Sequence, residues 1–166
     1  MIELSKQKKR CHTVSAWTLY KEKILLVKHK KLGIWLAPGG HVEENELPHQ
    51  AAEREFFEET GVQATALSAF SSSVFAKDSH YLPLPFFCHV HDINKPREGS
   101  FCQEHYSWGF FVHVIDDSGF GMNDDESTDI SWFTRDEVMS LETAPAIIKE
   151  ALFVFDNFPT THSFLS

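Results

Sequence analysis

The sequence lacks the features that mark membrane, secreted and disulfide-rich proteins. No apolar run approaches the roughly 20 residues that a membrane-spanning helix requires, so we expect no membrane association. No apolar segment follows the basic N-terminal residues, so we expect no secretory signal. The three cysteines, Cys11, Cys88 and Cys102, are odd in number and lack Cys-x-x-Cys spacing, which argues against a disulfide framework or a zinc ribbon. A protein of the reducing cytoplasm fits this pattern best.

Basic residues are also scarce relative to acidic ones. The 166-residue chain has 15 Lys and Arg against 24 Asp and Glu, a formal net charge of −9, which argues against duplex nucleic acid as a partner. Hydrophobic residues make up 42% of the chain and charged residues 23%, values typical of a folded globular protein. The sequence has no internal repeat and no evident linker, and we therefore expect a single domain over residues 1–166.

Several segments have the patterns of strands. Residues 13–20 and 24–30 are apolar, β-branched runs separated by three charged residues, and they predict a hairpin. Residues 85–91 and 106–115 predict a second hairpin, and residues 62–76 predict an extended segment. The expected sheet would thus contain strands from both halves of the chain.

The segment between the two predicted hairpins has the end signals of a helix. Pro48 suits the first helical position and Gly61 the position just past the end, so the sequence predicts a helix over residues 48–60. Leu47 is a poor N-cap, since a Ser or Thr there would stabilise the helix by about 1 kcal/mol more.

Two further helices are predicted near the C-terminus. A capping box at residues 134–137 predicts a short helix, and an amphipathic pattern predicts another over residues 143–155. The apolar face of the last helix consists of Ile147, Ile148, Ala151, Leu152 and Phe155. The order of the elements is typical of an α/β (α+β) layered domain with a mixed β-sheet between helices.

Acidic residues crowd the first predicted helix and the loop before it. Seven Glu and one Arg lie between residues 43 and 59, a net charge of −6. At about 100° per residue, Glu55, Glu58 and Glu59 share an arc of about 100° on the helix surface. Like charges at these spacings repel each other. The cluster is either an ordinary solvated acidic face or a site for a hard cation, Mg²⁺ or Mn²⁺, which takes oxygen ligands.

A wider motif favours the cation site. From Gly40, five residues lead to Glu46, and seven more lead to Arg54-Glu55-Phe56-Phe57-Glu58-Glu59-Thr60-Gly61-Val62. This pattern resembles the Nudix box, and all nine of its specified positions match. Two features depart from the family's usual pattern: Phe56 replaces a commoner aliphatic residue, and Leu47 replaces a Ser or Thr cap. Neither is a candidate metal ligand, so they bear on stability rather than on activity.

The resemblance implies a fold and a set of metal ligands. The fold would be a Nudix-like α/β/α sandwich with a mixed β-sheet. Glu55, Glu58 and Glu59 would bind the metal, and the carbonyl of Gly39 would add an oxygen ligand.

The resemblance also implies residues that position these ligands. Arg54 would pair with Glu46 and Glu55 and so hold the loop and the ligands in place. Gly40 would let the backbone turn close to the metal, and Gly61 would end the helix.

The implied activity is Mg²⁺-dependent (or Mn²⁺-dependent) hydrolysis of the diphosphate bond of a nucleoside diphosphate linked to another moiety. The metal would make an attacking water more acidic, and a carboxylate would take its proton. Glu59 is the first choice for this general base and Glu126 the second, because relatives often supply an acid from the loop before Trp132. Glu98 and Glu104 are weaker candidates. The substrate would be a small-molecule nucleotide or diphosphate, while its identity, the number of metals and the choice between monomer and homodimer stay open.

Two other functions share this fold. One is a catalytically weak nucleotide-binding or sensor module, but such modules often lose acids of the motif, and here the acids are complete. The other is an isoprenoid isomerase, which needs a cysteine in the loop before the helix. This chain has Leu36-Ala37-Pro38-Gly39-Gly40 there, so we exclude the isomerase.

Some residues outside the motif have two interpretations. His89 and His91 would share one strand face and suit a metal, although two partly exposed strand histidines are the commoner case. The basic residues at 28–31 suit either a phosphate or a solvated strand end. Three aromatic residues suit base stacking, but in so aromatic a chain such residues more often belong to the core or its rim: Trp35, Tyr81 and Phe101.

Overall fold

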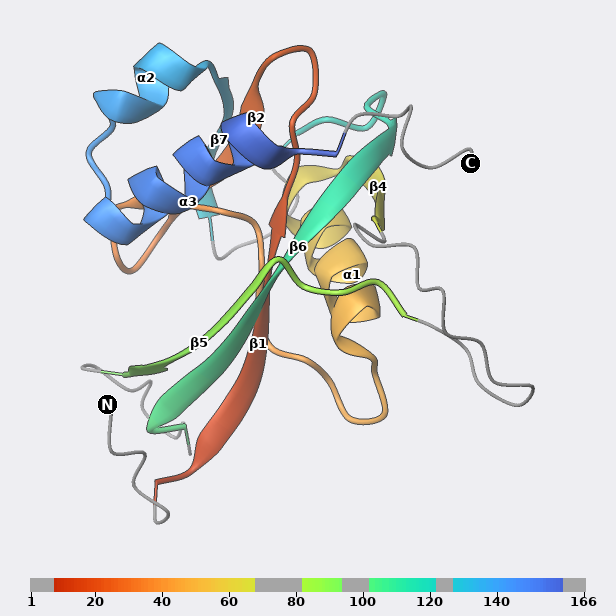
Figure 1. Ribbon diagram of the computed structural model, residues 1–166, viewed down its shortest axis with the longest axis vertical. Coiled ribbons are helices and arrows are strands. Elements are labelled where there is room, and N and C mark those ends of the chain that lie inside the picture. Colours follow the sequence, from red (N-terminus) through yellow and green to blue (C-terminus); the bar gives the residue numbers. More distant parts are fainter. Residues whose placement is uncertain (1–7, 68–81, 94–101, 122–126, 160–166) are drawn as a thin grey trace.

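The computed structural model describes residues 8–67, 82–93, 102–121 and 127–159. Within these ranges the chain forms seven strands and three helices (Figure 1), in the order β1 Arg10–Trp17, β2 Ile24–His29, β3 Trp35–Leu36, α1 Pro48–Thr60, β4 Gln63–Ala66, β5 Phe87–Asp92, β6 Glu104–Asp116, β7 Ser127–Phe133, α2 Arg135–Met139 and α3 Pro145–Asn157. In this part of the chain no helix is both long enough and apolar enough to cross a bilayer.

The strands form two sheets. In the first sheet, β6 lies between β1 and β4 and also pairs with β5. β1 runs parallel to β6, whereas β4 and β5 run antiparallel to it. In the second sheet, β2 lies between β3 and β7 and is antiparallel to both. β4 is the strand within the segment predicted as extended over 62–76, of which residues 68–76 lie outside the described ranges.

Strand side chains fill two apolar cores on opposite faces of the sheets. On β6, Phe110 and Val112 lie in one core and Phe111 lies in the other, because successive side chains of a strand point to opposite faces. α1 contributes Ala52 and Phe56 to the first core, and α2 and α3 cover the second. Figure 1 shows α1 and α3 on different sides of β6. The predicted α/β layering with a mixed sheet between helices is therefore confirmed.

α1 begins and ends at the residues that the sequence predicts, Pro48 and Thr60. Leu47 makes no side-chain cap, but its backbone N–H donates to Oε1 of Gln50 at 3.1 Å, which satisfies one donor at the helix start. Gly61 has a φ of 68°, a left-handed conformation that glycine adopts without strain at the end of a helix. These local signals set the position of the helix in the chain and hence the positions of its glutamates.

The C-terminal helices differ slightly from the predicted ones. The predicted capping box is confirmed, since Thr134 accepts a hydrogen bond from the N–H of Glu137 and α2 follows. α3 starts at Pro145, two residues later than predicted, because the residue before a proline is held in extended backbone. The buried residues of α3 are Ala151 and Val154, and the second of these was not in the predicted apolar face.

The predicted pairing of the first two strands is wrong. Tyr20 and Lys23 form an isolated bridge across a tight turn in which Lys21 and Glu22 both have positive φ. On either side of this turn the strands separate into different sheets, because β1 pairs with β6 and β2 pairs with β3 and β7. The predicted second hairpin is confirmed, since β5 and β6 are antiparallel neighbours. A turn is a local property of the sequence, whereas strand pairing depends on distant partners.

The argument against disulfides is also wrong for one pair of cysteines. Cys11 on β1 and Cys102 just before β6 form a disulfide, with a Cα–Cα distance of 5.6 Å. The parallel pairing of β1 with β6 brings together these residues, which are 91 positions apart. Cys88 on β5 is exposed and does not take part. The cysteine pattern therefore gives no support to a reducing compartment.

Candidate functional site

Arg54 on α1 is the centre of a network of carboxylates. Its Nε and Nη2 donate to the two carboxylate oxygens of Glu46 at 2.8 and 3.0 Å, which forms a two-point ion pair. Its Nη1 donates to Oε1 of Glu55 at 2.8 Å and to Oε2 of Glu58 at 3.0 Å. Nη2 also donates to the backbone carbonyl of His41 at 3.0 Å. One guanidinium thus ties the loop before α1 to two acids on the helix.

The charges around Arg54 do not balance. Three carboxylates share one guanidinium, and the side chains of Glu46, Glu55 and Glu58 are 15%, 16% and 53% exposed. Hydrogen bonds from Arg54 hold the pKa of Glu46 below its usual value. Burial raises the pKa of Glu55, despite the opposing hydrogen bond from Arg54. The charge of Glu55 is therefore incompletely compensated, and a cation beside it would favour its ionised form.

Two glycines bring the loop before α1 against the helix acids. The N–H of Gly39 donates to Oε2 of Glu59 at 2.9 Å, and Glu59 is only 8% exposed. A Cβ atom at Gly40 would overlap the carboxylate of Glu55. Glycine permits this approach because it has no side chain. The glycine pair therefore shapes the surface on which the acids lie.

The three glutamates predicted as metal ligands lie on one helix but do not form a tight group. Glu55 and Glu58 meet at Arg54, whereas Glu59 turns towards Gly39. Within the described residues, no group of three ligand atoms that includes an oxygen of these glutamates has all its atoms within 4.8 Å of one another. A hard cation at this face would complete its coordination with water and substrate oxygens, as Mg²⁺ commonly does.

The other candidate residues are engaged elsewhere or lie outside the described part of the chain. Glu104 forms ion pairs with Arg10 at 2.7 Å and Lys8 at 3.2 Å, so it ties the start of β6 to the start of β1. The ring of Trp35 packs edge-on against that of Phe133 at 4.8 Å between centroids, which places it at the second core. Four candidates fall outside the described residues: Tyr81, Glu98, Phe101 and Glu126.

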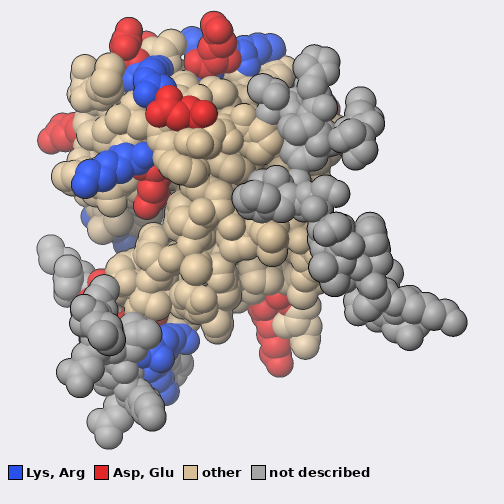
Figure 2. Space-filling model, viewed as in Figure 1, with Lys and Arg blue, Asp and Glu red and all other residues tan. Residues whose placement is uncertain are grey.

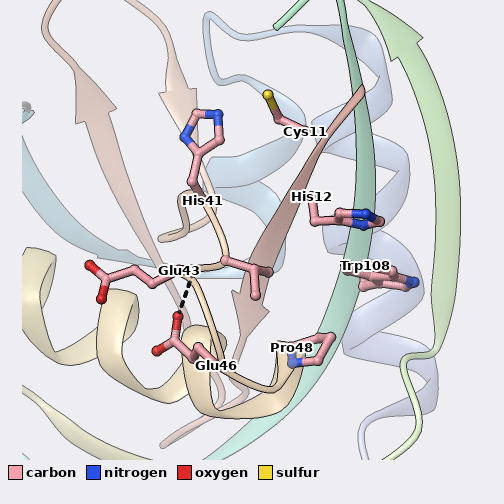
Figure 3. A pocket seen from close by; sticks show the side chains of 8 residues that line it. Cys11, His12, His41, Glu43, Glu46, Pro48 and Trp108 are labelled. Atoms are coloured by element: carbon pink, nitrogen blue, oxygen red, sulfur yellow. Dashed lines mark hydrogen bonds between the residues drawn. The ribbon is translucent and has the colours of Figure 1, made fainter. Parts of the chain in front are cut away.

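A cavity of about 520 Å³ lies beside the arginine network. Its walls come from β1, the loop before α1, the start of α1 and β6, and are formed by Cys11, His12, His41, Val42, Glu43, Glu46, Pro48 and Trp108. Figure 3 shows His12 and Trp108 on one wall and Glu43 and Glu46 on the opposite wall. The rings of His12 and Trp108 are stacked, with 4.9 Å between centroids and 6° between planes. Because Glu46 belongs to both structures, the cavity lies next to the acids of α1.

Sequence reasoning missed the aromatic wall of this cavity. His12 lies on β1 and Trp108 on β6, so they meet only because these distant strands pair in parallel. His12 also lies 5.8 Å from Tyr106, measured between ring centroids. The alternation of Tyr106 and Trp108 was the available signal, because strand residues two positions apart share a face.

A row of histidines leads from β5 to the cavity. The ring centroids of His89 and His91 are 5.3 Å apart, those of His91 and His105 are 5.3 Å apart, and those of His105 and His41 are 5.0 Å apart. Burial lowers the pKa of both His89 and His91. The shared strand face predicted for these two histidines is therefore part of a longer row that ends at the loop before α1.

Comparisons with known proteins place this site in a family context. The sequence model of the NUDIX domain matches residues 9–154. The chain is 28% identical over 115 residues to an RNA pyrophosphohydrolase of Bartonella bacilliformis, a match that covers 69% of this chain and 62% of that protein. It is 29% identical over 85 residues to an 8-oxo-dGTP diphosphatase of Proteus vulgaris, which covers 48% of this chain and 76% of that protein.

The extent of these matches limits what they show. A Bacillus subtilis relative is 52% identical over 48 residues, which are 29% of this chain and 32% of that protein. The chain therefore spans less than two thirds of the length of the Bacillus and Bartonella relatives. A solved NUDIX-family hydrolase from Clostridium perfringens superposes with a TM-score of 0.71 and 24% identity, covering 89% of this chain and 97% of that chain. At this identity the likeness shows the fold alone.

Proposed function

Because the chain belongs to the NUDIX domain family, we propose that it hydrolyses the diphosphate bond of a nucleoside diphosphate linked to another moiety, with Mg²⁺ or Mn²⁺ as cofactor. The observation that carries this proposal is the network around Arg54, in which one motif acid from the loop before α1 and two from α1 itself converge on one guanidinium. Glu59 adds a fourth carboxylate, turned towards Gly39, so the site holds more negatively charged oxygen donors than its one arginine can neutralise. Hard divalent cations bind such donors.

We assign the metal ligands to Glu55, Glu58, Glu59 and the carbonyl of Gly39. Two features of the site fit a cation: the raised pKa of Glu55, and the absence of a side chain at Gly40 where Glu55 approaches. A bound cation would supply charge neutralisation at the diphosphate oxygens and would make an attacking water more acidic.

The remaining steps belong to side chains of the protein. Arg54 holds Glu46 and Glu55 in fixed positions, so the acids do not have to reorganise when substrate binds. We propose Glu59 as the general base. The N–H of Gly39 fixes one of its oxygens, and its burial limits the positions that the other oxygen can take. A carboxylate held in this way can accept the proton of an attacking water, a role worth about 10²–10⁴ in rate. Glu126 is the second choice.

The cavity beside Glu46 is the proposed place for the substrate. Its volume of about 520 Å³ lies in the range of small-molecule sites. The stacked rings of His12 and Trp108 offer a flat wall for a nucleobase, and the diphosphate would extend towards the opposite wall, where Glu46 lies. Figure 2 shows basic and acidic side chains intermixed over α2 and α3, without a continuous basic stripe on this face. The chemistry therefore favours a small nucleotide over duplex nucleic acid.

A substrate panel tests the proposal. The protein should cleave at least one member of a set of nucleotide sugars, dinucleoside polyphosphates and nucleoside triphosphates when Mg²⁺ or Mn²⁺ is present. Glu58→Gln and Glu59→Gln should lower kcat by about 10²–10⁴-fold, measured by chromatography of the products. Glu142→Gln, at an exposed position before α3, is the matched control and should keep the wild-type rate. Circular dichroism should show that all three variants are folded.

Two outcomes would contradict the proposal. Full activity in both Glu58→Gln and Glu59→Gln would overturn the assignment of the site. Tight nucleotide binding without turnover under either metal would instead indicate a sensor or binding module.

A further inference from the structure

A second cluster of metal-binding side chains lies at the edge of the cavity. One ligand atom from each of Cys11, His41 and Cys102 lies within 4.8 Å of the other two. We propose that these three residues form a binding site for Zn²⁺ once the disulfide between the two cysteines is reduced. The site is separate from the acids of α1, and the proposal does not depend on the proposed hydrolase activity.

The backbone holds the three residues in place. Cys11 lies on β1, and Cys102 lies two residues before the first residue of β6, the strand that pairs with β1. His41 forms a bridge with Thr13 of β1, and its carbonyl accepts a hydrogen bond from Arg54 at 3.0 Å. Three segments that are distant in the sequence are therefore fixed against one another before any ligand binds. A site built on such segments loses little conformational entropy when it takes up a metal.

The distances suit a tetrahedral zinc ion. Sγ of Cys102 and Nε2 of His41 are 3.7 Å apart. Zn–S bonds of about 2.3 Å and Zn–N bonds of about 2.0–2.1 Å at a tetrahedral angle place the two ligand atoms about 3.6 Å apart. The two sulfurs would lie about 3.8 Å apart in such a site, which requires a rotation of a cysteine side chain after reduction. Thiolate and imidazole ligands select zinc over magnesium.

The chemistry balances in two steps. A dithiol reductant transfers two electrons and two protons to the disulfide, which yields two thiols on the protein and a disulfide on the reductant. Zn²⁺ then replaces the two thiol protons, which pass to solvent. The two thiolates neutralise the charge of the ion, and the neutral ring of His41 is the third ligand.

Three protein ligands leave the fourth position to water, as in open zinc sites. Cys11 and His41 both line the cavity, so this position lies at the cavity edge (Figure 3). The ring of His105 packs edge-on against that of His41, with 5.0 Å between centroids, and so restricts the orientation of the ligand ring. Orientation of a ligand by its neighbours is a usual part of a metal site.

Cobalt spectroscopy of the full chain tests the site. When Co²⁺ is added to protein that has been reduced with a dithiol and freed of metal by a chelator, a thiolate-to-cobalt absorption band should appear and saturate at one equivalent of thiolate-bound Co²⁺, and Zn²⁺ should abolish it by displacement. Cys11→Ser and Cys102→Ser should lose the band, and His41→Gln should weaken Co²⁺ binding by at least about tenfold. Cys88→Ser is the matched control, since Cys88 is exposed and lies outside the cluster. The double variant Glu58→Gln, Glu59→Gln should keep the band.

Thiol reactivity of the wild-type protein gives a second test that needs no variant. In the reduced chain, Zn²⁺ should protect two of the three thiols from a disulfide reagent, while the third reacts. The proposal is overturned if all three thiols react equally with and without Zn²⁺, or if no thiolate band forms in fully reduced protein. A band that survives in Cys102→Ser or is unaffected in His41→Gln would equally contradict it.

Discussion

α1 and α3 have the same length and begin in the same way, yet their buried surfaces differ. Each has 13 residues, a proline in its first turn and an N-cap residue without a capping side chain. α3 buries Ala151 and Val154, whereas α1 buries Glu59 alongside apolar residues such as Phe56. Burial of a carboxylate is unfavourable unless it is paired or hydrogen-bonded. The comparison therefore indicates that α1 has requirements beyond stable folding, while α3 serves the core.

The arginine of α1 and the arginine that pairs with α3 show the same difference. Arg54 is 24% exposed and contacts three acids, which fixes the geometry of a face of α1. Arg135 of α2 pairs with Asp156 of α3 at 2.7 Å, and the two side chains are 45% and 58% exposed. Exposed pairs of this kind contribute about 0–1 kcal/mol. Arg54 is therefore expected to matter for function and Arg135 for little more than the contact between α2 and α3.

The largest combined effect on stability and activity should come from filling the space between the loop and α1. In Gly40→Ala, the new methyl group would displace the carboxylate of Glu55, at a cost of about 1–3 kcal/mol in stability and more than about tenfold in activity. Gly121→Ala is the matched control, because the nearest atom to a Cβ there is 3.8 Å away. Urea unfolding and Mg²⁺-dependent rates would measure both effects. Equal stability and equal rates in the two variants would show that the close approach of Gly40 to Glu55 does not matter for activity.

The features of α1 could be predicted from the sequence because they depend on neighbouring residues. The bounds of α1 follow from Pro48 and Gly61, and the arc of its acids follows from helical spacing, so both are local properties. The contacts of Arg54 with Glu46 and Glu55 were expected from the motif and are present.

Features that depend on strand pairing escaped prediction. The turn at residues 20–23 was recognised, but the partner of β1 was not, because β6 lies far along the chain. The disulfide and the stacking of His12 on Trp108 both result from that same pairing. No spacing rule connects residues 11, 41 and 102, so the cluster that they form becomes visible only once the sheet is assembled.

A smaller effect is expected when the side chain of Arg54 is replaced by one of different shape and the same charge. In Arg54→Lys, one ammonium cannot reproduce the two-point contact with Glu46 together with the contact to Glu55. Loss of such a positioning contact should weaken metal affinity by about 10–100-fold. The Mg²⁺ concentration that gives half-maximal rate would report this change, with kcat at saturating Mg²⁺ less affected. Arg135→Lys should alter neither quantity, and a matching loss in that variant would remove the distinction between the two arginines.

The smallest effect concerns Glu150 on α3, whose pKa is shifted by burial. Burial raises the pKa of Glu150 from 4.5 to about 7, so the folded chain holds this proton more tightly than the unfolded chain does. The folded state is therefore favoured below pH 4.5 and loses stability as the pH rises from there to about 7, above which the loss is constant. Glu150→Gln removes a carboxylate charge that burial makes unfavourable. It should match the wild-type Tm near pH 4.5 and exceed it at pH 8, by the equivalent of about 1 kcal/mol or less because the side chain is partly exposed. Activity should not change, in contrast to any acid-to-amide change among the ligands on α1. A Tm difference that is the same at both pH values would mean that the fold does not keep Glu150 protonated. Glu150 would then no longer contrast with the acids of α1 as an acid that affects stability alone.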